Sequence, residues 1–303
     1  MATLQAIQKV VFLGLGHSGK SSIKSVVFEG KSPEEVMEYA ATINYTRSTK
    51  GVLDSAFQIF DCGGQENFIS VFVGEQAEFI FSDVMVLIWV VDVSNMDQIS
   101  TSKFYFDHAI KRLNQYSPEA EVFVFFHKND LIIPNLRKQV IETMEQYFVI
   151  PYDNKITYRA TSIFNQSIYL AIGEIIRTLM IKSTKAQTVS EAIREFLKQN
   201  EELGGVSIYT AEEGLPVFEE GELAEQIIIP ANLCLTTNER IGSEFNVTDV
   251  FKTTIETNDY IFVFQHLKTT QELLLSGIAR KIAPLQYVMV KMEQLAAIVK
   301  DLL

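Results

Sequence analysis

Residues 14–21 read Gly14-Leu15-Gly16-His17-Ser18-Gly19-Lys20-Ser21 and complete the pattern GxxxxGK(S/T). An apolar segment ends at this pattern and an amphipathic segment begins at Lys20, so we predict a glycine-rich turn between a strand and a helix. Such turns bind phosphate, because successive backbone N–H groups and the helix N-terminus point into the loop. Lys20 would contact the β- and γ-phosphates, and the Ser21 hydroxyl would coordinate Mg²⁺. The predicted phosphate-binding residues are Gly16, His17, Ser18, Gly19, Lys20, Ser21 and Ser22.

Short apolar strands and amphipathic helices alternate over residues 9–180. The expected strands are Lys9–Leu15, Thr42–Lys50, Ser55–Asp61, Val84–Val91, Val122–His127 and Ile156–Ala160. The expected helices are Lys20–Phe28, Phe68–Phe81, Thr101–Tyr116, Leu136–Tyr147 and Gln166–Met180. Because no helix separates the second strand from the third, we expect these two to pair antiparallel at one edge. The fold class is therefore α/β, a Ras-like P-loop G domain with a six-stranded, mostly parallel sheet.

A second motif, Asp61-Cys62-Gly63-Gly64-Gln65, follows the third expected strand. In G proteins a carboxylate at this place reaches the Mg²⁺ shell, usually through water, the glycine N–H meets the γ-phosphate, and the glutamine orients the attacking water. We give these roles to Asp61, Gly64 and Gln65, with Gln65 as the catalytic residue. The Gly-Gly-Gln form favours a site that is able to hydrolyse the nucleotide.

A third motif, Phe126-His127-Lys128-Asn129-Asp130, closes the fifth expected strand. Asp130 would accept two hydrogen bonds from guanine, at N1–H and at the exocyclic amine. Adenine offers neither donor and would leave the carboxylate unpaired, at a cost of roughly 1–3 kcal/mol or more. The stem of Lys128 would lie against the base, and its ammonium would lean toward the P-loop. His127 is counted with Lys128 and Asp130 as a nucleotide-binding residue, although it departs from the general NKxD rule, in which Asn or Thr is usual.

Two further segments match the G-protein pattern loosely. Thr161-Ser162-Ile163 stands where a loop supplies backbone N–H groups to the guanine oxygen, with Ser162 and Ile163 as candidates, although a plain helix cap also explains these residues. Thr42 is the expected Mg²⁺ and γ-phosphate ligand of the first switch segment, since it lies just ahead of the second strand. The alternatives are Thr46, Ser48 and Thr49.

The order of elements changes in the C-terminal part. Residues 182–188 are polar and are predicted to be a linker. Beyond them we expect helices Val189–Leu203, Gly221–Gly242 and Pro284–Leu303, and strands Val206–Ala211, Leu215–Glu219, Val250–Glu256, Tyr260–Leu267 and Glu272–Ala279. Pro230 should kink or split the middle helix. This α+β order predicts two domains, residues 1–183 and 184–303.

Composition excludes several classes of protein. The formal net charge is −12, and residues 184–303 alone carry 18 acidic against 10 basic side chains, which argues against binding to nucleic acid. Cys62 and Cys234 stand far apart, so we expect neither disulfides nor a zinc site, as in a reducing cytosol. The longest apolar run, Val84–Val91, is too short to span a bilayer. We expect a cytoplasmic protein without direct membrane insertion, which reaches a membrane only through partners.

With these motifs in place, the chain resembles the Rag/Gtr family of small GTPases. The likeness is carried by DCGGQENF at residues 61–68, HKND at residues 127–130 and TSI at residues 161–163, and it covers most of residues 8–182. His127 is thus a departure from Ras but not from Rag. The C-terminal unit looks like a roadblock domain, through its order of elements and its hairpin at Gly214–Val217.

The resemblance implies a dimeric switch that binds GTP or GDP with Mg²⁺. In this family the roadblock domains hold the dimer together, and effector and regulator proteins read the nucleotide state. We expect a homo- or heterodimer through the C-terminal domain and slow GTP hydrolysis. A GTPase-activating partner is also expected, because no arginine is placed to act in cis. The alternative is a nucleotide-binding dimeric scaffold with negligible hydrolysis; Asp130 argues against a third reading, an ATP-dependent enzyme.

Overall fold

The computed structural model describes residues 7–37, 42, 45–52, 55–180, 183–245 and 252–303. The chain divides into two compact units, residues 1–51 with 56–171 and residues 52–55 with 172–303. The division falls inside helix α6 (Ser167–Met180), whereas the sequence analysis places it after residue 183. The 183/184 boundary stays a prediction. Each unit has its own sheet.

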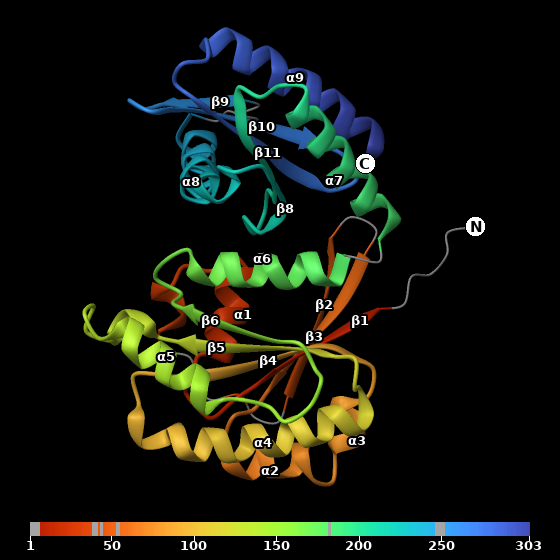
Figure 1. Cartoon of the computed structure of the whole chain (residues 1–303), viewed down its shortest axis with the longest axis vertical. Coiled ribbons are helices and arrows are strands. Elements are labelled where there is room, and N and C mark those ends of the chain that lie inside the picture. The colour runs from red at the N-terminus through yellow and green to blue at the C-terminus, as the bar shows by residue number, and fades with distance from the viewer. Residues whose placement is uncertain (1–6, 38–41, 43–44, 53–54, 181–182, 246–251) are drawn as a thin grey trace. The chain divides into compact units, whose positions relative to one another are not determined.

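A six-stranded sheet forms the centre of the first unit (Figure 1). The strands run in the order β2-β3-β1-β4-β5-β6, and the neighbours from β3 to β6 pair in parallel. Their bounds are β1 Gln8–Leu13, β2 Tyr45–Val52, β3 Ser55–Cys62, β4 Val84–Asp92, β5 Glu121–His127 and β6 Ile156–Thr161. This confirms the predicted α/β class with a six-stranded, mostly parallel sheet.

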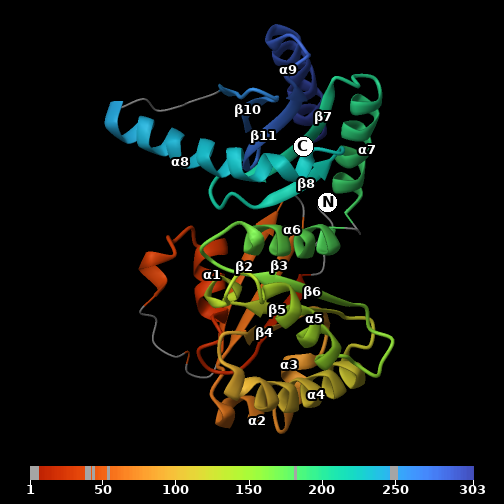
Figure 2. The same cartoon turned by 60° about the vertical axis from the view of Figure 1, so that its left-hand side comes forward.

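Helices cover both faces of this sheet. Their bounds are α1 Lys20–Phe28, α2 Glu66–Val73, α3 Ala77–Phe81, α4 Ile99–Tyr116 and α5 Arg137–Tyr147. Figures 1 and 2 show α2, α3 and α4 together on one face. Side chains alternate along a strand, so Phe60 of β3 joins the core under these helices. Phe57 meets Phe28 of α1 on the opposite face, with ring centroids 6.4 Å apart.

The single helix predicted over Phe68–Phe81 is wrong, because the structure has two helices there. α2 ends at Val73, the Gly74 N–H donates to the Val71 carbonyl at 3.3 Å, and α3 begins at Ala77. The apolar spacing continues across the break, so Phe72 and Ile80 are buried in the same core. The sequence pattern therefore resembled one uninterrupted helix, although glycine readily ends helices.

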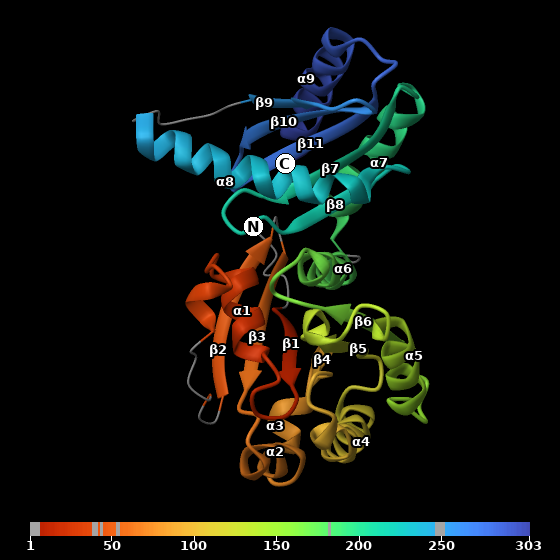
Figure 3. The same ribbon diagram turned by 90° about the vertical axis from the view of Figure 1, so that its left-hand side faces the viewer.

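The second unit contains a five-stranded antiparallel sheet in the order β8-β7-β11-β10-β9. The strands are β7 Leu203–Thr210, β8 Pro216–Glu220, β9 Lys252–Glu256, β10 Tyr260–Lys268 and β11 Glu272–Arg280. The helices are α7 Thr184–Lys198, α8 Ile228–Phe245 and α9 Leu285–Leu302. Helix α8 lies along one face, and α7 and α9 lie together on the other (Figure 3). The predicted α+β order is confirmed and is consistent with a roadblock-like domain.

The linker predicted over residues 182–188 is wrong from residue 184 onward. Ser183 caps α7, since its hydroxyl oxygen accepts from the Ala186 N–H at 3.0 Å. A buried stripe then runs along the helix through Ala186, Val189, Ile193 and Phe196. The first turn is mostly polar and was predicted to belong to the linker. The predicted helix, Val189–Leu203, therefore starts later than α7, and it also ends five residues beyond Lys198. Residues 181 and 182 lie outside the described residues.

The helix predicted over Gly221–Gly242 is split close to Pro230. A 3-10 turn, Ala224–Ile227, precedes α8, and Pro230 stands in the first turn of that helix. A backbone N–H in the first turn has no helical acceptor, so proline costs little there. The start of the predicted strand Val250–Glu256 lies outside the described residues.

The longest apolar run of the sequence is the buried strand β4. Within the described ranges, no helix combines the length and apolarity needed to cross a bilayer. Cys62 and Cys234 are both buried as free thiols.

Candidate functional site

A cavity of about 340 Å³ lies where β1 and β5 end, at the edge at which open α/β sheets bind ligands. Most of the predicted binding residues meet there. Its wall includes Gly16, His17, Gly19, Lys20, Ser21, Ser22, Thr42, Gly64, Gln65, His127, Lys128, Asp130 and Ile163. Ser18, Asp61 and Ser162 are buried and are not part of this wall.

Lys20 is a buried cation surrounded by neutral acceptors. Its ammonium donates to the carbonyl oxygens of Gly14 at 2.9 Å and Leu15 at 2.8 Å, and to the Ser18 hydroxyl at 3.4 Å. Burial lowers the pKa of Lys20 to about 8, against the opposing charge of Asp61. The three acceptors that contact this ammonium are neutral, so a phosphate in the cavity would give it a negatively charged partner. This fits the predicted role of Lys20.

Two glycines keep the loops close around the cavity. Gly19 has a φ of +99°, and a Cβ there would lie 2.6 Å from Cδ2 of the His127 ring. A Cβ on Gly64 would lie 2.4 Å from both the Leu15 carbonyl oxygen and the Lys20 ammonium nitrogen. Both positions are too crowded for a side chain. The Asp61–Gln65 segment is therefore packed directly against the P-loop.

The three predicted Mg²⁺ ligands come together from distant parts of the first unit. The Ser21 hydroxyl donates to Oδ2 of Asp61 at 2.7 Å and lies 2.7 Å from the Thr42 hydroxyl oxygen. Oδ1 of Asp61 is buried without a hydrogen-bond partner, and burial raises the pKa of this carboxyl. Two hydroxyls beside an incompletely satisfied carboxylate are the hard oxygen ligands that Mg²⁺ prefers, so the residues fit the ion.

The alternatives to Thr42 do not share this position. The Thr46 hydroxyl instead accepts from the ammonium of Lys24 on α1 at 3.3 Å. Thr49 is exposed on β2, away from the cavity wall. Of the open possibilities, only Thr42 contacts Ser21 among the described residues.

The far end of the cavity is formed by the loops after β5 and β6. Lys128 and Asp130 line it, and the Arg137 guanidinium fixes the loop by donating to the Asp130 carbonyl oxygen at 3.0 Å. The Ser162 N–H donates to the Ser167 hydroxyl at 2.9 Å. Ser162 is thus part of a helix-start turn, and Ile163 is the residue of that motif that reaches the cavity.

His127 is almost fully buried between the P-loop and β6. Its Nδ1 lies 2.9 Å from the Thr161 hydroxyl oxygen, and its ring edge faces Gly19. Burial is the main cause that lowers the pKa of His127 to about 4. The ring is therefore neutral at physiological pH and acts as a spacer that holds the P-loop against the end of β5.

A model of the Gtr1/RagA G protein conserved region matches residues 9–215, which is more than half of the chain. The chain belongs to the Gtr1/RagA family of G proteins. The match includes the whole cavity described above and extends into the second unit.

Individual members of the Gtr1/RagA family are similar at a moderate level. The chain is 31% identical over 196 residues to GTP-binding protein GTR1 of Saccharomyces cerevisiae, covering 63% of each protein. It is 30% identical over 177 residues to Ras-related GTP-binding protein A of Dictyostelium discoideum, covering 57% of this chain and 58% of that protein. The chain thus spans about three fifths of the length of the curated relatives that it matches.

Among solved structures, the Arl6 BBS3 small GTPase of Trypanosoma brucei with a bound nucleotide analogue matches 59% of this chain and all of its own. The TM-score is 0.47 and the identity 21%. This likeness is too distant to carry an argument about function.

Several residues that line the cavity were not predicted from the sequence. Three large apolar side chains line the cavity although each is more than half exposed: Met37, Leu131 and Phe164. Exposed apolar groups in the cavity wall that also contains Asp130 suit contact with the flat faces of a base. Phe164 directly follows the recognised motif, so its adjacency was the available signal. Val36, which also lines the wall, had no such signal.

We expect acid to weaken this fold partly through His127. The pKa of histidine is about 6.5 in an unfolded chain and about 4 here, so the unfolded state binds the proton first. The stability linked to this ring is complete above pH 6.5 and is lost as the pH falls toward 4. When the pH is lowered from 7 to 5, the unfolding free energy of both proteins should fall. The fall should be about 2 kcal/mol smaller for His127→Asn than for the parent.

Urea unfolding at both pH values measures this difference, with the exposed His108→Asn as the control. If His127→Asn lost as much unfolding free energy as the parent, the ring would not be held neutral by burial.

Proposed function

We propose that this chain is a GTP-dependent molecular switch that binds GTP or GDP with Mg²⁺ and slowly hydrolyses GTP. The observation that carries the proposal is that one cavity joins Lys20 and the Ser21–Thr42 hydroxyl pair to Asp130. Lys20 and the two hydroxyls suit the phosphates and their Mg²⁺ ion, and the Asp130 carboxylate suits the hydrogen-bond donors of guanine. Membership of the Gtr1/RagA family supports the same reading.

In this proposal the hydroxyls of Ser21 and Thr42 would hold the Mg²⁺ ion together with the Asp61 carboxylate, which accepts from the Ser21 hydroxyl. When bound, Mg²⁺ neutralises charge on the terminal phosphates. Lys20 would contact the β- and γ-phosphates. The Gly64 N–H would bind the γ-phosphate, so the position of the Asp61–Gln65 segment would depend on whether GTP or GDP is bound. Gln65, exposed at the start of α2, orients the attacking water.

The first test is the nucleotide that the purified protein carries. Protein that has been incubated with guanine nucleotide and Mg²⁺ should release GDP or GTP on denaturation, close to one equivalent per chain. Ion-exchange chromatography identifies and quantifies the released nucleotide. Release of adenine nucleotides, or no nucleotide after loading, would contradict the proposal. This measurement needs no variant.

Ser21→Asn should weaken binding of GTP more than binding of GDP, because the lost hydroxyl serves the cation that bridges the terminal phosphates. The ratio of the two Kd values should change roughly tenfold or more. Titration calorimetry in Mg²⁺ measures it, with Ser100→Asn on the exposed side of α4 as the control. An equal loss for both nucleotides would reduce Ser21 to a helix-start residue.

Fast hydrolysis is proposed to need a partner. Of the described residues, those that line the cavity include no arginine, so the charge that stabilises the transition state has to come from elsewhere. A GTPase-activating protein that inserts an arginine would supply it. Effectors would then read the resulting nucleotide state.

The second unit is proposed to form the dimer, with α8 as the contacting helix. Ile229 and Leu233 stand one turn apart on α8 and are 60% and 58% exposed. Apolar side chains repeated at this spacing suit a helix that packs against another chain. The partner is a second copy of this chain or a related Rag/Gtr chain.

We expect the full chain to dimerise with rising concentration and Leu233→Glu to shift it to monomer. Multi-angle light scattering measures the mass, and Ile282→Glu, 89% exposed outside α8, is the matched control. The isolated residues 184–303 should dimerise as well, and residues 1–183 should not. A full chain that stays monomeric would contradict the homodimer and leave a different Rag/Gtr chain as the partner.

A further inference from the structure

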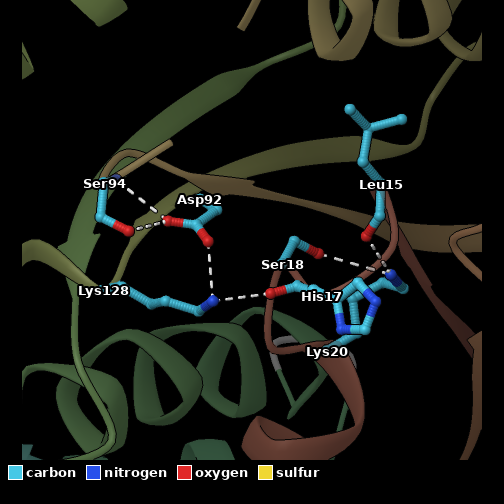
Figure 4. A network of polar contacts seen from close by, with 7 residues as sticks. All are labelled: Leu15, His17, Ser18, Lys20, Asp92, Ser94 and Lys128. Atoms are coloured by element: carbon cyan, nitrogen blue, oxygen red, sulfur yellow. Dashed lines mark hydrogen bonds and ion pairs between the residues drawn. The ribbon is translucent and has the colours of Figure 1, made fainter. Parts of the chain in front are cut away.

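Asp92, the last residue of β4, lies beside the cavity but has no place in the motifs described above. Its Oδ2 accepts from the Lys128 ammonium at 2.7 Å, and the same ammonium donates to the His17 carbonyl oxygen at 2.7 Å (Figure 4). The ion pair is only partly exposed, with 12% of the Asp92 side chain accessible. One ammonium therefore ties the end of β4 and the end of β5 to the P-loop.

The carboxylate of Asp92 is itself held in one orientation. Its Oδ1 accepts from both the backbone N–H of Ser94 at 3.0 Å and the Ser94 hydroxyl at 2.5 Å (Figure 4). Because Oδ1 is occupied on the Ser94 side, Oδ2 faces Lys128. This arrangement fixes the direction in which the ammonium points.

Lys128, which carries this ammonium, and His17, whose carbonyl oxygen accepts from it, both have unfavourable backbone conformations. His17 has a φ of 61° and Lys128 a φ of 60°, in the left-handed region that residues with a Cβ rarely adopt. Such conformations persist only where the surroundings hold them. Both residues also line the cavity, His17 in the P-loop and Lys128 next to Asp130.

We propose that Asp92 is a positioning residue that holds the Lys128 ammonium on the P-loop and thereby slows release of the bound nucleotide. Without the carboxylate, the one acceptor left to the Lys128 ammonium among the described residues is the neutral His17 carbonyl oxygen, and the Lys128 side chain can leave it more readily. The hydrogen bond between the Lys128 ammonium and the P-loop is then less firmly held. This role rests on the proposed function, since it concerns the lifetime of a guanine nucleotide in the cavity.

The test uses the full chain loaded with a fluorescent GDP and chased with excess GDP. Asp92→Ala should raise the dissociation rate roughly 10- to 100-fold, as expected for loss of a charged hydrogen bond. Asp92→Asn keeps one acceptor oxygen and should raise it less. Asp107→Asn, which removes an exposed carboxylate paired with Lys103 on α4, should leave the rate within about twofold.

A double-mutant cycle separates positioning from general stabilisation. In a Lys128→Ala background, adding Asp92→Ala should change the dissociation rate by no more than about twofold, because the residue through which Asp92 acts is gone. An equal increase in both backgrounds would overturn the proposal. So would unchanged release from Asp92→Ala and Asp92→Asn in a parent that retains GDP. A parent that retains no guanine nucleotide would overturn the proposed function and this role with it.

Discussion

Asp130→Asn should lower the affinity for GTP by roughly 10²- to 10⁴-fold, the largest effect expected of any single side chain that contacts the base. In the proposed site the Asp130 carboxylate would accept hydrogen bonds from guanine N1–H and from the exocyclic amine, whereas an asparagine amide would turn a donor toward one of them. Xanthine carries an oxygen in place of that amine and matches the amide. The variant should therefore prefer xanthosine triphosphate to GTP.

Calorimetry with GTP and xanthosine triphosphate measures both affinities. Asp97→Asn, on an exposed turn outside the cavity wall, is the matched control and should bind GTP like the parent. The structure supports the design, because Arg137 holds the Asp130 backbone and the substitution changes only the side-chain tip. Unchanged GTP affinity in Asp130→Asn would place the base elsewhere.

Gln65→Leu should slow GTP hydrolysis roughly 10- to 100-fold while GTP binding is retained. Leucine fills the same space but neither donates to nor accepts from water, so the nucleophile loses its orientation. GTP binding should survive, because the role proposed for Gln65 concerns the attacking water rather than the phosphates. The parent itself should be slow, at about 10⁻⁴ to 10⁻³ per second, as G proteins without an arginine are.

Single-turnover phosphate release measures both rates. Gln139→Leu on the exposed face of α5 is the control and should hydrolyse like the parent. Equal rates for Gln65→Leu and the parent would mean that another group positions the water. The nucleotide-binding scaffold would then become the better description of this chain.

The sequence alone determined the elements whose signals are contiguous. The P-loop, the Asp61–Gln65 motif and the Phe126–Asp130 motif each stand at the end of a buried strand. The sequence pattern predicted all six strands to within three residues at each end. The errors came where a local pattern was ambiguous. The apolar stripe continued through the break at Gly74, and polar residues hid the first turn of α7.

Only the tertiary structure decided which side chains meet in the site. Ser21 contacts Thr42 and Asp61, at separations of 21 and 40 positions, and Lys128 contacts Asp92 across 36 positions. No periodicity encodes such pairs, because they depend on which strand ends the sheet order brings side by side. Thr42 was preferred from the sequence over three other hydroxyl-bearing residues, and the structure adds that the Thr42 hydroxyl lies 2.7 Å from that of Ser21. Asp92 belongs to no motif that the sequence offered. Its contact with Lys128 exists because β4 and β5 are neighbouring strands whose ends lie at the P-loop.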